Sequence, residues 1–321
     1  MIPALASPPG SSWRRFSFVA PRQPPPNGDG RDGSETDGNN RARQRSSRFA
    51  RSICGRRYRL HGVRRYRNPE LPMSSTTSGT GFDPERQAIA LACRVLAARD
   101  LAPGILGHIS LRVDGDRLLI RCRGPRERGL AFTTAEDIRL VTLDGTEGAA
   151  GEFDDGYQPP NELPLHTEVL RARGDVNAVV HAHPAAVVAA DLAGLAVRPI
   201  VGAFDIPGFR LAAGGVPVYP RGVLLRNRQL AQEMVAAMGD RPVVILRAHG
   251  LTSVAETVER AVIQAISVDT ISRLSLQIAS AGGALAELTD DDAAELPDLG
   301  NALNDTIAWR HELGRLENHR S

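Results

Sequence analysis

From Asp83 onward, the chain alternates between segments typical of β-strands and segments typical of α-helices, and this alternation limits the fold most strongly. Helices are predicted within 83–101, 159–175, 224–240 and 254–283, and strands within 107–124, 176–184 and 241–250. The hairpin predicted within 107–124 turns at Asp114-Gly115. Strands that alternate with helices predict a single α/β domain with helices on both faces of one sheet.

Residues 1–72 differ from this pattern, because Arg, Pro and Gly dominate and no helical or strand period is sustained. Such a composition buries too little apolar surface to offset chain entropy, so we expect a disordered extension before a domain at 73–321. The extension could be a basic arm that binds nucleic acid or an Arg-rich targeting peptide. We favour a third interpretation, in which the start codon was assigned too early and Met73 is the first native residue.

The sequence contains no lysine, so all 39 basic residues are arginines. Without lysine, an enzyme cannot form a Schiff base, attach pyridoxal phosphate or hold a phosphate with the lysine of a Gly-rich loop. Carbonyl or carbanion chemistry in this chain would therefore require a metal ion or another cofactor.

Charge and cysteine content argue against several other classes. A net charge of only +2 disfavours a nucleic-acid partner for the globular part. Cys54, Cys93 and Cys122 are odd in number and widely spaced, which disfavours a disulfide framework and favours a reducing cytoplasm. The apolar stretches are interrupted well before the roughly 18 residues that a membrane-spanning helix requires, so we expect no membrane association.

The segment "VNAVVHAHP" places His181 and His183 two residues apart at the end of an apolar strand. Side chains at this spacing point to the same face of a strand, as two ligands of one metal must, and Pro184 ends the strand behind them. A third histidine, His249, ends the apolar segment "PVVILRAHG", and Gly250 behind it allows a sharp turn. The alternative is that each histidine is a structural residue at a strand end, but the combination favours a metal site.

Glu162, in "PPNELPLH", lies just before a predicted helix that leads into the strand of His181. A carboxylate here could be a fourth metal ligand or a base that acts on the substrate. It could also be a first-turn residue that the helix dipole favours.

These motifs resemble the class II aldolase and adducin family over about Phe82 to Leu288: a Glu, then an H-x-H, then an H-G after a strand. The resemblance implies that His181, His183, His249 and Glu162 hold one divalent ion, with zinc or manganese favoured over iron or cobalt. It also implies that Glu162 acts as a metal ligand or as an acid/base. The fold that the resemblance implies is a three-layer αβα sandwich with a mixed, mainly antiparallel sheet. Homotetramers with sites at subunit interfaces are expected as well.

The chain departs from the sugar-phosphate aldolases of this family where they bind phosphate. Their "T-G-N-x-S" turn is "LGHIS" here, with His108 in the Asn place and Ser110 kept, and a later "S-G" segment has become "RCRGPRERG". Arginine forks also suit carboxylates, so Ser110, Arg121, Arg123 and Arg126 are predicted to bind a carboxylated substrate. The chain is thus similar to the decarboxylase branch of the family.

His108 is the second predicted catalytic residue after Glu162, as a proton donor or as a ligand of the substrate carboxylate. We expect His166, one helical turn after Glu162, to pack or cap rather than face the site. No role is assigned to Trp309, Arg310 and His311, although relatives can reach into a neighbouring site with this tail.

The leading hypothesis is a metal-dependent carbon–carbon lyase that decarboxylates a hydroxylated aromatic, dihydroxyphthalate-like or related unsaturated carboxylate through a metal-stabilised enolate. The alternative is an aldolase, epimerase or dehydratase of a sugar or sugar acid. A non-catalytic, adducin-like scaffold is the third hypothesis. It is disfavoured because a scaffold does not need a complete ligand set.

Overall fold

The computed structural model describes residues 81–300 and 303–318. All of them belong to one compact unit, Met73–Ser321. The extension predicted over residues 1–72, and with it the interpretation that Met73 is the first residue, lies outside the described residues.

Within these residues, seven strands form one sheet in the order β3-β2-β1-β4-β7-β6-β5. The strands are β1 His108–Asp114, β2 Arg117–Arg121, β3 Ile138–Thr142, β4 Ala178–Ala182, β5 Val218–Tyr219, β6 Val243–Leu246 and β7 Gly250–Ala255. Only the β5–β6 pair is parallel, and the other neighbouring pairs are antiparallel. This arrangement confirms the predicted mixed, mainly antiparallel sheet and the hairpin of β1 and β2.

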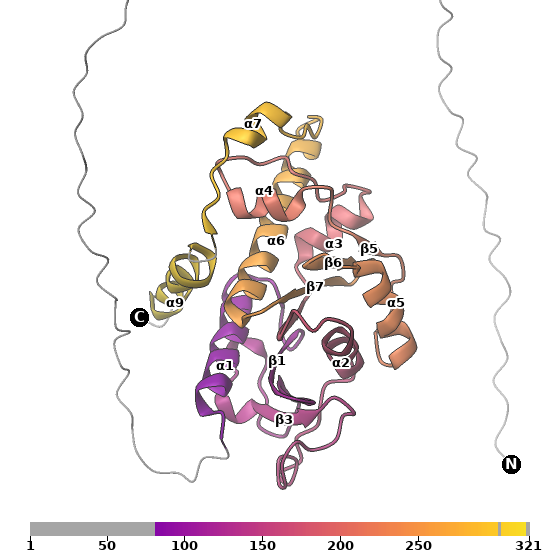
Figure 1. Cartoon of the computed structure of the whole chain (residues 1–321), viewed down its shortest axis with the longest axis vertical. Helices are drawn as coiled ribbons and strands as arrows, with labels where there is room; N and C mark the ends of the chain where they lie inside the picture. The colour runs from indigo at the N-terminus through magenta and orange to yellow at the C-terminus, as the bar shows by residue number, and fades with distance from the viewer. Residues whose placement is uncertain (1–80, 301–302, 319–321) are drawn as a thin grey trace, which may run out of the picture. The chain divides into compact units, whose positions relative to one another are not determined.

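Helices cover both faces of this sheet (Figure 1). They are α1 Asp83–Ala98, α2 Leu163–Ala172, α3 Ala185–Leu192, α4 Ile206–Ala212, α5 Arg228–Met238, α6 Val258–Ser280, α7 Asp290–Glu295 and α9 Trp309–Asn318. Short 3-10 turns lie at Leu130–Phe132 and Ala135–Asp137, and a π-helical turn at Leu303–Ala308 precedes α9.

The two faces form separate hydrophobic clusters, because alternate residues of each strand point in opposite directions. Val180 of β4 faces α1, α3 and α6, whereas Val179 faces α2 and α5. The result is the three-layer αβα sandwich that the resemblance implies. His181 is on the same side as Val179, at the centre of the sheet, and its side chain is fully buried. A polar residue there requires partners of its own.

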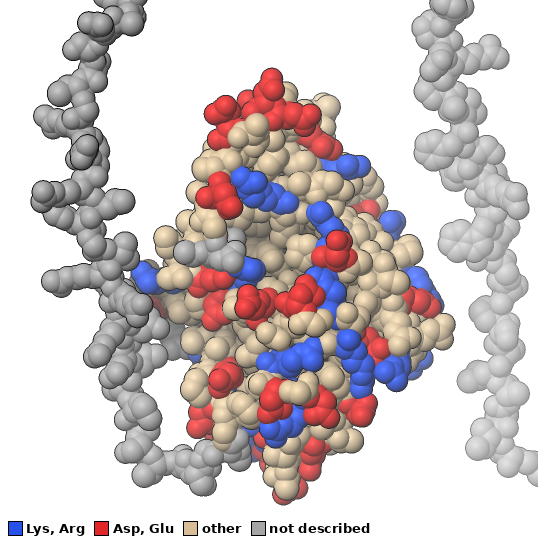
Figure 2. Space-filling model, in the orientation of Figure 1, with Lys and Arg blue, Asp and Glu red and all other residues tan. Residues whose placement is uncertain are grey.

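On the face shown in Figure 2, arginines and acidic residues are interspersed, with an acidic group over α7. No helix in the described ranges is both long and apolar enough to cross a membrane.

Candidate metal centre

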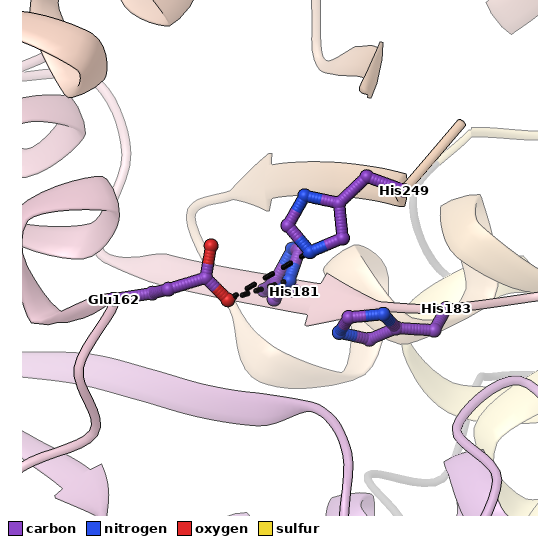
Figure 3. Close-up of side chains that lie close together, drawn as sticks. All are labelled: Glu162, His181, His183 and His249. Atoms are coloured by element: carbon purple, nitrogen blue, oxygen red, sulfur yellow. Dashed lines mark ion pairs between the residues drawn. The ribbon is translucent and has the colours of Figure 1, made fainter. Parts of the chain in front are cut away.

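The four side chains predicted to bind metal lie together where the end of β4, the β6–β7 turn and the start of α2 meet (Figure 3). Glu162 is the N-cap of α2, His181 is in β4, His183 follows β4 directly, and His249 lies between β6 and β7. One ligand atom from each lies within 4.8 Å of the others. We refer to these four residues as the donor cluster.

Backbone contact between β4 and β7 holds His183 beside His249. A Cβ atom at Gly250 would lie 2.2 Å from the carbonyl oxygen of Ala182, so only glycine permits this approach. A sharp turn directly precedes Gly250, and its left-handed residue is Ala248, with φ of 52°. The backbone N–H of Ala248 donates to Asp191 Oδ2 at 2.9 Å, which stabilises that turn.

Glu162 is oriented by one backbone contact and surrounded by imidazoles. Its Oε1 accepts a hydrogen bond of 2.9 Å from the backbone N–H of Leu225. Its Oε2 lies 3.4 Å from His181 Nε2 and 3.8 Å from His249 Nε2. Burial favours the protonated acid, but interactions with His108 and His181 outweigh burial and hold the pKa of Glu162 well below its usual range.

The donor cluster fits a divalent cation. His181 Nδ1 contacts the carbonyl oxygen of Leu251 at 3.0 Å, which leaves Nε2 buried without a hydrogen bond, and Nδ1 of His249 is buried without one too. The unpaired Nε2 of His181 faces Glu162, and an unpaired buried nitrogen costs about 1–3 kcal/mol, a cost that coordination would remove. Burial, assisted by neighbouring histidines, lowers the pKa of His183 to about 2 and also lowers that of His249. Neutral imidazoles with an ionised carboxylate are the protonation states that metal binding requires.

His108 lies next to the donor cluster because β1 pairs with β4, and the register places it opposite His181. The two ring centroids are 5.0 Å apart, and His108 Nε2 is 3.8 Å from Glu162 Oε2. Burial, its largest cause, lowers the pKa of His108 to about 4. The structure therefore brings both predicted catalytic residues, Glu162 and His108, into contact.

A cavity of about 350 Å³ opens beside these residues. It is lined by Leu106, Gly107, His108, Arg123, Gln158, Pro159, Pro160, Asn161, Glu162, His183 and Leu224. The sequence interpretation assigned no role to Gln158, Asn161, Leu106 or Leu224. Of these four residues, only Asn161 could have been assigned to the site from the sequence, since it directly precedes Glu162.

Ser110 and His166 lie behind the cavity wall rather than on it. Both are fully buried, and Ser110 Oγ is 2.7 Å from His166 Nδ1. The other ring nitrogen of His166 is 2.7 Å from His108 Nδ1. Ser110, predicted to bind substrate, therefore does not line the cavity and is linked to it through the imidazoles of His166 and His108. His166 packs as expected, but it packs against a site residue.

Two of the three predicted substrate arginines have guanidinium groups that are engaged away from the cavity. Arg121 is buried, forms an ion pair with Glu127 and donates from Nε to Thr133 Oγ1 at 3.1 Å. Arg126 is exposed, and its Nη2 donates to Asp155 Oδ2 at 2.8 Å. Neither residue lines the cavity.

Arg123 is the predicted arginine that does line the cavity. Its Nη1 lies 3.4 Å from Glu127 Oε1, a carboxylate that Arg121 already occupies. Its backbone forms a two-way hydrogen-bonded bridge with Gln158, at 2.9 and 2.7 Å. One carboxylate thus serves two guanidinium groups, which leaves positive charge at the cavity wall.

Comparison with known proteins identifies this architecture. Residues 87–276 match the model of the class II aldolase and adducin N-terminal domain. The chain belongs to the class II aldolase and adducin family. A solved structure of an aldolase II superfamily protein from Pseudomonas syringae has the same fold, with a TM-score of 0.62 and 24% identity over 75% of this chain and 95% of that chain.

Two more similar relatives are both 3,4-dihydroxyphthalate decarboxylases. The chain is 71% identical over 244 residues to the protein of Arthrobacter keyseri, which covers 76% of this chain and 98% of that protein. It is 68% identical over 236 residues to the protein of Terrabacter sp., which covers 74% of this chain and 98% of that protein. The predicted resemblance to the decarboxylase branch of the family is confirmed.

Proposed function

We propose that this chain is a metal-dependent 3,4-dihydroxyphthalate decarboxylase. The observation that carries the proposal is one cavity lined by members of the donor cluster, by His108 and by Arg123. The substrate has two adjacent hydroxyls and two adjacent carboxylates, so it needs both a chelating centre and a group that holds a carboxylate. The identity of 71% to a decarboxylase of this substrate supports the same assignment.

The reaction breaks the bond between the ring and the carboxylate beside a hydroxyl. The electron pair stays on the ring carbon, CO₂ leaves, and the carbon takes up one proton that water supplies. A divalent ion held by Glu162, His181, His183 and His249 would supply a Lewis acid that stabilises the negative charge on the neighbouring oxygens. Three imidazoles and one carboxylate suit several divalent ions, of which we propose zinc or manganese.

Arg123 is proposed to hold the substrate through a carboxylate. It is half-buried at the cavity wall, and its bridge to Gln158 fixes the backbone from which it projects. Because Glu127 is shared with Arg121, the guanidinium of Arg123 keeps donors available for a planar bidentate pair. A sugar phosphate would require the small-residue phosphate turn, where His108 stands in this chain.

We also propose that the enzyme domain spans 73–321, works in the cytoplasm and forms a homotetramer with sites at subunit interfaces. The match to 98% of the Arthrobacter keyseri protein uses 76% of this chain, which agrees with a domain of that size. Cys93 and Cys122 are free thiols, which suits a reducing compartment.

Leu106 and Leu224 are exposed apolar residues at the cavity, where a second subunit would cover them. Light scattering of the purified full chain tests the tetramer.

The proposed activity is tested by measuring CO₂ release from 3,4-dihydroxyphthalate with the full-length chain. Activity is expected to vanish on complete chelation and to return with zinc or manganese. Undiminished CO₂ release from fully metal-free protein would contradict the proposal. Cleavage of a sugar phosphate without CO₂ release would support the aldolase alternative instead. Arg126→Ala is a matched control, because that arginine lies outside the cavity.

A further inference from the structure

A line of hydrogen-bonded side chains runs from β1 through α2 to the cavity wall. Ser110 Oγ is 2.7 Å from His166 Nδ1, and His166 Nε2 is 2.7 Å from His108 Nδ1. The remaining nitrogen of His108, Nε2, lies 3.8 Å from Glu162 Oε2. Ser110 and His166 are fully buried and His108 nearly so, which isolates this line from bulk water.

The hydrogen-bond donors and acceptors along this line can be assigned in two ways. A contact of 2.7 Å between two imidazole nitrogens requires that one donates and the other accepts. If Ser110 donates to His166, then His166 donates to His108, and His108 carries its own proton on Nε2. If every bond is reversed, His108 carries its proton on Nδ1 and turns a lone pair toward the cavity. A doubly protonated His108 would also donate from Nδ1, so it requires the same reversed bonds to His166 and Ser110.

The pairing of the Ser110 hydroxyl selects the first arrangement. In the reversed arrangement, the hydroxyl proton of Ser110 would need another acceptor. Among the residues that the structure describes, His166 is the only hydrogen-bond partner of Ser110 Oγ, so that buried proton would stay unpaired at a cost of about 1–3 kcal/mol.

We infer that Ser110 and His166 are positioning residues that hold His108 as a neutral imidazole with its proton on Nε2, so that His108 serves the substrate as a hydrogen-bond donor and not as an acid. This inference rests on the proposed function for the identity of the acceptor, a substrate oxygen. A neutral imidazole that gave up its Nε2 proton would become an imidazolate. His166 and Ser110 cannot replace the lost proton, because their line of hydrogen bonds ends in a serine hydroxyl, a very weak acid. If His108 only donates a hydrogen bond, it keeps its proton and no imidazolate forms.

The tautomer is measured directly by ¹⁵N NMR of the full-length, zinc-loaded protein labelled in its histidines. The signals of His108 are assigned by their loss in His108→Gln. We expect Nε2 of His108 to be protonated and Nδ1 to be the unprotonated nitrogen. A protonated Nδ1 would overturn the inference. This readout needs no substrate, so it stands even if 3,4-dihydroxyphthalate proves to be the wrong compound.

Substitution at His108 separates a donor from an acid. Glutamine keeps an N–H donor but cannot transfer a proton, whereas leucine keeps neither. We expect His108→Gln to retain kcat within about 10-fold of the parent and His108→Leu to lose about 100-fold more. Equal loss in the two variants, with metal content unchanged, would overturn the inference and make His108 the acid.

Substitution at His166 tests its positioning role. His166→Leu removes the donor to His108 Nδ1 and is expected to raise KM and lower kcat/KM by about 10–100-fold, with a mixed tautomer at His108. His166→Gln can still donate to that nitrogen and is expected to recover most of the loss. If leucine and glutamine behave alike, and the NMR signals of His108 do not move, His166 only fills space.

Discussion

The donor cluster and the arginine-rich segment 121–128 are both dense in polar side chains, yet they differ in how those side chains are paired. In the donor cluster, buried nitrogens of His181 and His249 lack hydrogen bonds. In the arginine-rich segment, Arg121 and Arg126 already pair with carboxylates of the protein. In the donor cluster, unpaired buried nitrogens lie where four donor side chains converge, whereas the guanidinium groups outside the cavity already have carboxylate partners.

The largest expected effect is the loss of a donor. His181→Ala is expected to lower kcat by about 10³-fold or more, because several kcal/mol of charge stabilisation depend on the ion. Metal content by elemental analysis and CO₂ release are measured together. Full activity at full metal content would show that His181 is not a ligand. The donor cluster would then not differ in function from the arginine-rich segment.

Loss of the buried arginine is expected to act on stability instead. Arg121→Met removes the buried partner of Glu127, which keeps only Arg123 and the backbone N–H of Gly129, and it removes the donor to the carbonyl oxygen of Gly107. We therefore expect a loss of roughly 3 kcal/mol in the free energy of unfolding. Urea denaturation measures it. A stable variant with a raised KM would assign Arg121 to substrate binding after all.

Acid is expected to destabilise the metal-free protein through the site histidines, whereas the guanidinium groups do not titrate in this range. The pKa of His108 falls from its ordinary 6.5 to about 4 on folding, mainly by burial. The unfolded chain therefore binds a proton that the folded chain does not, and stability falls as pH drops from 6.5 to 4. This residue alone contributes roughly 3 kcal/mol over that interval. Urea denaturation at several pH values is compared with His108→Gln, whose pH dependence is expected to be shallower. Equal slopes would contradict this account.

Arg123 is expected to behave unlike its neighbours. Arg123→Gln is predicted to raise KM by about 10–100-fold, the value of one charge-assisted carboxylate contact, with little change in thermal stability. Steady-state kinetics and a thermal melt measure the two effects. An unchanged KM would leave the cavity without its proposed carboxylate partner.

The smallest effect is expected at Arg126, whose guanidinium is exposed and paired with Asp155 at the surface. Arg126→Ala is predicted to leave KM, kcat and the melting temperature unchanged within error. A raised KM would show that the cavity extends to this arginine during catalysis.

Regular elements predicted the α/β fold class and the three histidines of the donor cluster, whereas Glu162 as a ligand was implied by the family resemblance. The same-face spacing of His181 and His183, and the helix start at Glu162, follow from strand and helix geometry alone. The pairing of β1 with β4, which sets His108 opposite His181, is a long-range contact that no local pattern encodes.

The substrate side of the site was harder to predict for a physical reason. Neighbouring arginines look alike in sequence, and their roles depend on which carboxylates the fold brings near. Glu127, only a few residues away, pairs with Arg121 and leaves Arg123 at the cavity. Likewise, the buried contacts of His166 depend on the packing of α2 against β1.

Gly250 has a consequence for redesign of this enzyme. Its backbone rests directly on that of Ala182, so the spacing between His183 and His249 is set by main-chain contact and not by nearby side chains. Enlarging or trimming the surrounding hydrophobic residues would then alter how firmly the protein holds together, while the gap between these two imidazoles stays the same. A change of metal preference would therefore require replacement of the donor residues themselves, because the backbone contact between β4 and β7 does not let their spacing change.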